Sequence, residues 1–200
     1  ADGSIQKRFG SSTQNTLVIG STGLAGWTLE TGTSLTANLQ AYWKLDESSS
    51  TRYDQFGSIS LTDINNNINA LSGIRGNAAG YSIVDSSTLY SSHNSSLSIG
   101  TGNFSASAWV YIDSLGTTSK VIMSKIGSNS FEWQILEGQS AGLERFSFDI
   151  GTGGPPVIAT VVANSLGAVN TSTWYNVIAW HSANSHIGIS VNLSVDTIPY

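Results

Sequence analysis

The chain has 200 residues, of which 10% are charged and 40% hydrophobic, and its formal net charge is −5. This length suits one all-β domain with an appendage, and the acidic balance argues against a broad nucleic-acid-binding surface. Cysteine is absent, which excludes disulfides, thiolate catalysis and cysteine-ligated metals, and no apolar run approaches the roughly 18 residues of a membrane span.

The polarity of the chain comes from Ser, Thr, Asn and Gly more than from charge, since soluble proteins usually have about 25% charged residues. Such a composition favours a secreted or particle-bound protein over a cytosolic enzyme. Residues 1–8 lack the apolar core of a signal peptide. Two interpretations stay open: a mature form after cleavage, or a chain that has lost its initiator Met.

Residues 1–38 differ in pattern from the rest of the chain. The short apolar patches 17–19 and 27–29 lie between glycine joints and Ser/Thr/Asn runs. They predict an extended N-terminal arm with one or two short strands and no core of its own. Two roles stay open, a partly disordered leader or a docking arm that adds a strand to a neighbouring subunit.

Beyond residue 38, short strand candidates recur between turn signals, and no helical apolar period of more than a turn or two occurs. This pattern predicts an all-β fold, a β-sandwich or jelly roll. The main predicted strands are 41–45, 59–61, 78–84, 95–99, 104–112, 120–126, 131–136, 145–150, 157–162, 174–181, 187–191 and 194–196.

The clearest strand is 104–112, in which Phe and small apolar residues alternate with Ser, Trp109 and Tyr111. That period of two is typical of a strand with one apolar face. The segment 174–181 has apolar or aromatic residues on both faces, as in a strand covered on both sides. We therefore expect these two distant segments to be parts of one sheet.

Six motifs follow one another between Leu39 and Asp196. They are Ala41-Tyr-Trp-Lys-Leu-Asp-Glu47 with Asp54 and Gly57, Gly76-Asn-Ala78, Ser96-Leu-Ser98, Phe104-Ser-Ala-Ser-Ala-Trp-Val110 with Ile122-Met-Ser-Lys125, Trp174-Tyr-Asn-Val177, and Ile189-Ser-Val-Asn192 with Asp196. Laminin-G-like, concanavalin A-like jelly-roll domains have such motifs in this order, and the chain resembles that family.

The resemblance implies two curved antiparallel sheets packed face to face, a two-sheet jelly-roll sandwich over residues 39–200 with residues 1–38 as the arm. Family domains usually continue for a strand or two after the Val-Asn hairpin, whereas this sequence ends at Tyr200. Either the last strands are missing, or the arm or a neighbour supplies them. Because an unpaired edge invites aggregation, we expect 17–19 or 27–29 to cover it.

Carboxylate spacing indicates that the chain is not an enzyme. Glucanase relatives of this fold have acids on one strand face, and retaining hydrolysis needs two carboxyls about 5–5.5 Å apart. Glu132 and Glu137 are five residues apart, as are Glu144 and Asp149. On a strand, residues at that spacing point to opposite faces.

The sequence offers few candidate metal ligands. His181 and His186 flank a short turn and could approach each other across a hairpin, but a plain turn-flanking role is the alternative. The resemblance implies calcium as the commoner ligand of such domains, and Asp54, Asp63 and Asp113 are its candidate ligands in loops. The alternative is that these carboxylates accept turn N–H groups.

Aromatic residues carry the strongest binding hypothesis, because flat aromatic faces suit the C–H faces of pyranose rings. Trp109 and Tyr111 share one face of their strand, and Trp133 and Trp180 are further candidates for an exposed glycan-binding platform. The alternative is that these side chains fill the core. Trp43 and Trp174 are assigned to the structure because they belong to the fold motif.

The resemblance and the composition together predict a non-catalytic structural or adhesive surface module, located on a virion or in another extracellular assembly. The arm, residues 1–38, would bind other subunits, in a homo-oligomer, and the sandwich would contact glycans. No nucleic acid and no membrane span are expected, and no cofactor other than calcium. The alternative is a carbohydrate-binding module of a secreted polysaccharide-active protein.

Overall fold

The computed structural model describes residues 6–7, 17–18, 38–48, 50–82, 85–98, 100, 102–116, 118–127, 130–151 and 157–200. Within these ranges the regular structure consists of β-strands and one short 3-10 helix, η1 (Ser95–Leu97). The chain forms two compact units, Ala1–Ser92 and His93–Tyr200. No described helix has the length and apolar character that crossing a membrane requires.

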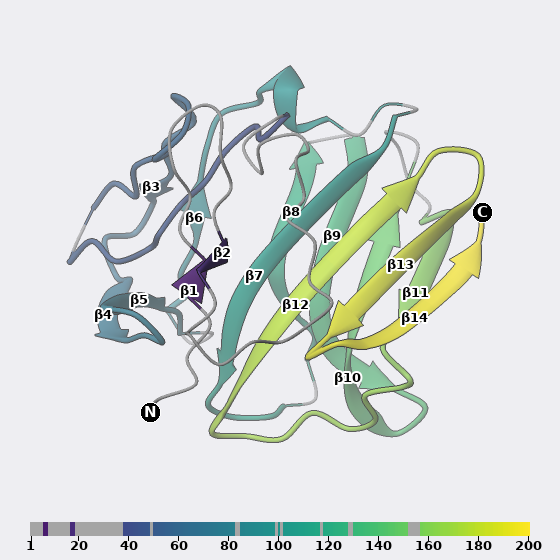
Figure 1. The fold of residues 1–200 in the computed structure, drawn as a ribbon. Helices are drawn as coiled ribbons and strands as arrows, with labels where there is room; N and C mark the ends of the chain where they lie inside the picture. The colour runs from purple at the N-terminus through teal and green to yellow at the C-terminus, as the bar shows by residue number, and fades with distance from the viewer. Residues whose placement is uncertain are drawn as a thin grey trace. The chain divides into compact units, whose positions relative to one another are not determined.

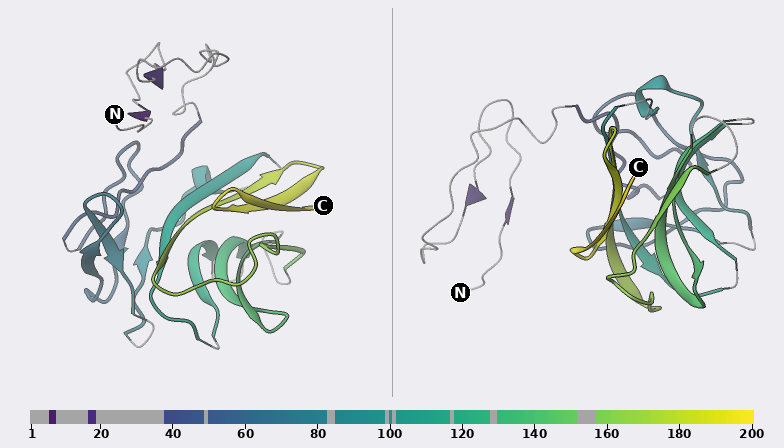
Figure 2. Two further views of the ribbon diagram at one scale, coloured as in Figure 1. Left: turned by 60° about the horizontal axis from the view of Figure 1, so that its bottom comes forward. Right: turned by 90° about the vertical axis from the view of Figure 1, so that its right-hand side faces the viewer.

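The second unit is a sandwich of two four-stranded antiparallel sheets, which Figure 2 shows edge-on as two layers. The front sheet in Figure 1 has the order β14-β13-β12-β7, and the rear sheet has the order β11-β10-β9-β8. Their bounds are β7 (Phe104–Ile112), β8 (Lys120–Gly127), β9 (Ser130–Ser140), β10 (Leu143–Ile150), β11 (Ala159–Val162), β12 (Thr173–Ser182), β13 (His186–Val191) and β14 (Ser194–Pro199). The all-β, antiparallel, two-sheet prediction is confirmed.

The predicted pair of distant strands forms part of the front sheet. β7 and β12 pair antiparallel over nine residue pairs, from Phe104 with His181 to Ile112 with Thr173. Burial alternates along β12, so that Tyr175, Val177 and Ala179 face the core while the residues between them are partly exposed. The period of two in the sequence therefore sorts side chains to the two faces as expected.

The core lies between the two sheets and is almost wholly aliphatic and aromatic. Phe146 of β10 contacts Tyr175 of β12 with ring centroids 5.1 Å apart, and this contact joins the two layers. Residues at which no more than 2% of the surface is exposed include Ile135, Phe146, Phe148, Ile150, Val161, Ala163, Val177, Ala179, Ile187, Ile189 and Val191. Burying each large aliphatic side chain contributes about 1.5–3 kcal/mol, so this layer dominates the stability of the unit.

The first unit has only two-stranded sheets among its described residues. They are β1 (Gln6–Lys7) with β2 (Leu17–Val18), β3 (Thr62–Asp63) with β6 (Leu89–Tyr90), and β4 (Asn69–Ser72) with β5 (Asn77–Gly80). The Arg52 side chain is fully buried here, and its guanidinium donates to the backbone oxygens of Ser50 at 3.0 Å and Ile68 at 3.4 Å.

Three predicted strands are wrong. The segment 59–61 forms no strand, and only Leu61 pairs, in an isolated bridge with Arg52. The segment 41–45 forms only an isolated bridge between Trp43 and Asp54, because Leu45 has φ of +59° and the Asp54 carboxylate accepts the N–H of Tyr42. Of the segment predicted over 95–99, Ser95–Leu97 forms η1 instead, with Asn94 as its N-cap. An Asn side chain that bonds the backbone locally competes with strand pairing.

The hairpin between β9 and β10 is longer than the sequence predicted. The strands expected over 131–136 and 145–150 extend to Ser140 and from Leu143, joined by Ala141 and Gly142. Both of these turn residues have positive φ, +53° and +79°. Such a two-residue turn matches the twist of the flanking strands, so pairing continues to the tip.

The predicted arm is described only in part. Leu17–Val18 pairs with Gln6–Lys7, and the expectation that 17–19 or 27–29 covers a sandwich edge stays a prediction. Residue 19 and the patch 27–29 lie outside the described residues. The boundary expected between residues 38 and 39 stays a prediction.

Replacing Ile135 by Ala should lower the free energy of unfolding by about 2–5 kcal/mol, because its side chain is fully buried and the change leaves a cavity. The matched control is Ile126→Ala on β8, where 54% of the residue is exposed and the loss should stay within about 0.5 kcal/mol. Urea unfolding of both variants measures the difference. Equal losses would contradict the assignment of the core.

Candidate functional site

The outer face of the front sheet carries the aromatic side chains that the sequence placed on one strand face. β7 and β12 put alternate residues outside, and β13 and β14 continue the same rows, so the register defines the members of this face. We call it the aromatic face: Ser105, Ser107, Trp109 and Tyr111 of β7; Trp174, Asn176, Ile178, Trp180 and Ser182 of β12; His186, Gly188 and Ser190 of β13; and Val195, Thr197 and Pro199 of β14.

Trp109 and Tyr111 are exposed on this face, with 56% and 44% of their surface accessible. Tyr111 lies opposite Trp174 in the register, and their ring centroids are 5.3 Å apart. Trp174, assigned to the structure from the fold motif, is thus also part of the aromatic face. The sequence contained a signal for this position that was missed. Trp174 and Trp180 are six residues apart on one strand, and an even spacing places both side chains on the same face.

Trp180 lies flat against the sheet. A Cβ added at Gly188, its neighbour on β13, would overlap the Trp180 indole, so only glycine leaves room for the ring in this position. The His186 ring meets the indole edge-on, with centroids 6.4 Å apart. The sheet below and the imidazole beside it together fix the orientation of this ring.

Trp133 does not belong to the aromatic face, and its prediction as an exposed platform residue is wrong. It lies on the core side of β9 with 4% of its surface exposed, and its ring packs against Phe104 at 4.7 Å. Its indole N–H donates to the Leu97 oxygen at 3.4 Å. A signal was present in the sequence, because the residues two positions away, Phe131 and Ile135, make its strand face apolar.

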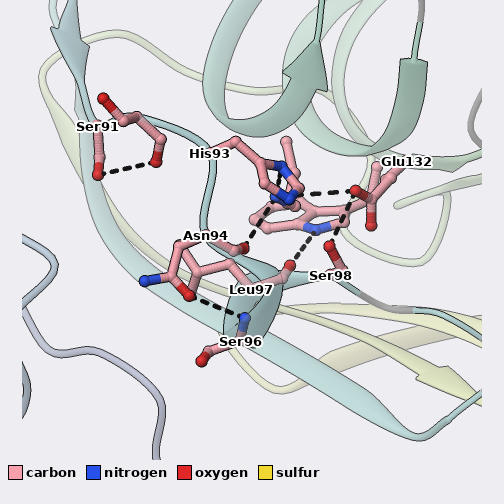
Figure 3. A network of polar contacts seen from close by, with 10 residues as sticks. Ser91, His93, Asn94, Ser96, Leu97, Ser98 and Glu132 are labelled. Atoms are coloured by element: carbon pink, nitrogen blue, oxygen red, sulfur yellow. Dashed lines mark hydrogen bonds and ion pairs between the residues drawn. The ribbon is translucent and has the colours of Figure 1, made fainter.

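A polar network holds the segment that contains η1 against the β8–β9 hairpin (Figure 3). Glu132 accepts a hydrogen bond from the Ser98 hydroxyl at 3.1 Å and lies 3.7 Å from the Lys125 ammonium. Lys125 also donates to the Asn94 backbone oxygen and contacts the His93 ring, both at 3.1 Å. Because these groups satisfy one another, the network is structural, and it covers the end of the core beside Trp133.

The candidate calcium ligand Asp54 is occupied by backbone N–H groups. Its carboxylate accepts from Tyr42, Phe56 and Ile59 at 2.9–3.1 Å. Burial raises the pKa of this carboxyl. The backbone N–H donors, with that of Gly57 among them, together lower the pKa by more than burial raises it, so the net pKa lies below 3.8. The carboxylate thus organises its loop, as the alternative interpretation expected.

Asp63 is buried and accepts the N–H groups of Asn67 at 3.3 Å and Ile68 at 2.9 Å, while Asp113 is exposed just after β7. Across the described ranges, no three His, Asp or Glu side chains gather in a way that would hold a metal ion. His181 is buried on the core side and His186 lies on the aromatic face, so they do not approach each other across the hairpin. Calcium at the three aspartates stays a prediction from the sequence.

Glu137 and Glu144 meet at the end of the β9–β10 hairpin. The sequence analysis missed this pair because it compared only carboxylates on the same strand. Glu137 lies opposite Phe146 and diagonal to Glu144 in the register. It has no exposed side-chain surface, and its Oε2 is 2.8 Å from the Lys120 ammonium. Burial raises the pKa of Glu137, the Lys120 hydrogen bond lowers it, and the hydrogen bond with Glu144 raises it again, so that the net pKa lies above 4.5.

This carboxyl pair does not have the arrangement of a glycosidase site. Two carboxyls in contact leave no room for a sugar between them, whereas retaining hydrolysis needs about 5–5.5 Å. Glu137 Oε1 and Glu144 Oε2 are buried, and no donor among the described residues bonds to them. The Lys120 ammonium, which contacts Glu137, offsets the negative charge at this buried position.

The stability of the unit should therefore fall as the pH rises. A carboxyl with a raised folded-state pKa contributes stability that is fully present below pH 4.5 and is lost as the pH rises through the folded-state value. Glu144→Gln removes the carboxyl that raises the pKa of Glu137, and it should reduce this loss. Thermal unfolding from about pH 4 to 9 measures it, with Asp46→Asn, at an exposed carboxyl, as the control. An unchanged pH profile in Glu144→Gln would contradict the contribution of Glu144 to the raised pKa.

Comparison with known proteins gives one finding. A family model described as the concanavalin A-like lectin/glucanases superfamily matches residues 85–198. This range includes the aromatic face apart from Pro199, the Glu137–Glu144 pair and nearly all of the eight strands of the sandwich. Searches of curated proteins and of solved structures gave no match.

Proposed function

The chain belongs to the concanavalin A-like lectin/glucanase superfamily, and on this premise we propose that it is a non-catalytic surface module that binds glycans through the aromatic face. The superfamily includes both binding modules and glycosidases, so membership is compatible with carbohydrate binding and does not decide catalysis. The proposal of a non-catalytic role rests on the carboxylates. The carboxyls of Glu137 and Glu144 are in contact, and the Glu137 side chain has no exposed surface.

The observation that carries the proposal is the gathering of Trp109, Tyr111, Trp174 and Trp180 on one outer sheet face. Most large aromatic side chains are buried in folded proteins, whereas this face leaves half of Trp109 accessible. The aromatic rings provide flat apolar surface, and the hydroxyls of Ser105, Ser107 and Thr197 on the same face provide hydrogen-bonding groups. That combination is what a pyranose ring requires, since its C–H faces are apolar and its rim is polar.

We propose a virion or another extracellular assembly as the setting, with residues 1–38 as the attachment arm of a homo-oligomer. The low charge and the Ser/Thr/Asn-rich composition support an outward-facing protein. The second candidate is a carbohydrate-binding module of a secreted polysaccharide-active protein, which the aromatic face favours equally. Glycan binding by an isolated monomer would favour the second candidate, and assembly into trimers or a particle would favour the first.

Trp109→Ala should weaken glycan binding at least tenfold. A ligand that covers about 100 Å² of this indole gains about 2.5 kcal/mol at about 25 cal/mol per Å², and every 1.4 kcal/mol is about tenfold in affinity. Binding is measured on a glycan array and then by titration with the strongest ligand. Tyr90→Ala is the control, because Tyr90 is equally exposed at 53% but lies on β6, outside the aromatic face. Equal affinity of Trp109→Ala and the parent would contradict the site.

Removing residues 1–38 tests the arm. The truncated chain should lose assembly, measured by light scattering, and should keep the unfolding temperature of the sandwich, because its core residues all lie at or beyond Phe104. Cooperative unfolding at a much lower temperature would instead make the arm part of the folded core and would end the docking proposal.

A further inference from the structure

Apart from the histidine His186, the aromatic face has no residue of a charged type. Along all four strands its positions hold Ser, Thr, Asn, Pro, Gly, Ile, Val, Tyr, Trp and one His, with no Asp, Glu, Lys or Arg. The Lys and Arg residues of His93–Tyr200 are Lys120, Lys125 and Arg145, and all three are on β8 and β10 of the other sheet. Asp196 of β14 is on the core side of its strand and accepts hydrogen bonds from Ser165.

We infer that the aromatic face selects uncharged saccharide chains and binds them with an affinity that does not depend on ionic strength. This inference rests on the proposed glycan-binding function and adds the chemical class of the ligand. A sulfated or uronic acid polymer is normally held by Arg or Lys, and a cationic amino-sugar polymer by carboxylates. Neither counter-charge is present on this face, so a charged sugar would lose hydration without gaining a partner.

The spacing of the rings indicates a ligand of more than one sugar ring. Trp109 lies opposite Asn176, and Trp180 follows four residues later on β12. At about 3.3 Å per residue, this places the two indoles about 13 Å apart along the strand. The exposed residues Ser105 and Ser107 lie on β7 along that interval. One sugar ring cannot contact both indoles, so the face suits an extended chain that follows the strands.

Gly188 sets the orientation of the second indole. The Trp180 ring lies over Gly188 in the space that a Cβ would take, so one ring face rests on the sheet and the opposite face is turned to the ligand. Gly188→Ala therefore tilts the indole without deleting it, and a stacking site should respond to that tilt. A site that uses only the hydrophobicity of Trp180 should bind with the same affinity after the tilt.

The test uses the full chain with two pairs of polymers that differ in charge, hydroxyethylcellulose against carboxymethylcellulose and dextran against dextran sulfate, in affinity electrophoresis at low salt and at about 0.5 M salt. We expect retardation by at least one neutral polymer, weaker or no retardation by its charged partner, and less than a twofold change of the neutral affinity with salt. Stronger binding of a charged partner, lost at high salt, would overturn the inference and leave glycan binding standing. Absence of retardation by all four polymers, together with a blank glycan array, would overturn the proposed function itself.

Gly188→Ala is the decisive variant, and it should weaken binding of the neutral polymer at least fivefold. Gly116→Ala is its matched control, because a Cβ at Gly116 meets only the flexible end of Lys120 at 3.9 Å. Thermal unfolding of both variants shows that they are folded. A folded Gly188→Ala chain with the affinity of the parent would overturn the role of Trp180 in the site.

Discussion

The antiparallel pairing of β7 with β12 is the contact on which the rest of the second unit depends. It joins distant segments of the chain over nine residue pairs, and its register decides which side chains enter the core. A slip by one residue would move Val177 and Ala179 outward and bring Ile178 and Trp180 inside. Because Tyr175, Val177 and Ala179 are almost wholly buried, the core excludes a register shifted by one residue. The same register gathers the exposed aromatic residues on the opposite face.

The two faces of the front sheet thus have different roles, and the alternation of side chains along each strand provides residues for both. The inner face contributes the apolar contacts that hold the layers together, and the outer face keeps aromatic rings at fixed positions on rigid strands. Sites on strands lose little conformational freedom when a ligand binds, because their backbone is already ordered. Gly188 illustrates the coupling, since the residue that weakens a strand by lacking a side chain is the one that lets the Trp180 indole lie flat.

The buried polar groups follow a similar logic in both units. The terminal nitrogens of Arg52 donate to backbone oxygens, Asp63 accepts backbone N–H groups, and Glu137 pairs with Lys120. In each case burial is tolerated because a partner of matching charge or hydrogen-bonding type lies within reach. These acidic residues therefore serve the fold, and the outer sheet face that we propose for binding is left uncharged.

The sequence by itself determined the fold class, the strand 104–112 and its partner at 174–181, and the shared face of Trp109 and Tyr111, because alternation along an extended chain is a local property. It failed where the outcome depended on contacts between distant segments. Trp133 is an aromatic residue of a strand as Trp109 is, yet the opposite sheet and Leu97 bury it. Glu137 and Glu144 meet only because a two-residue turn extends the β9–β10 pairing. Only the tertiary structure decided which face of each strand is covered, since that depends on the layer packed against it as well as on the strand's own residues.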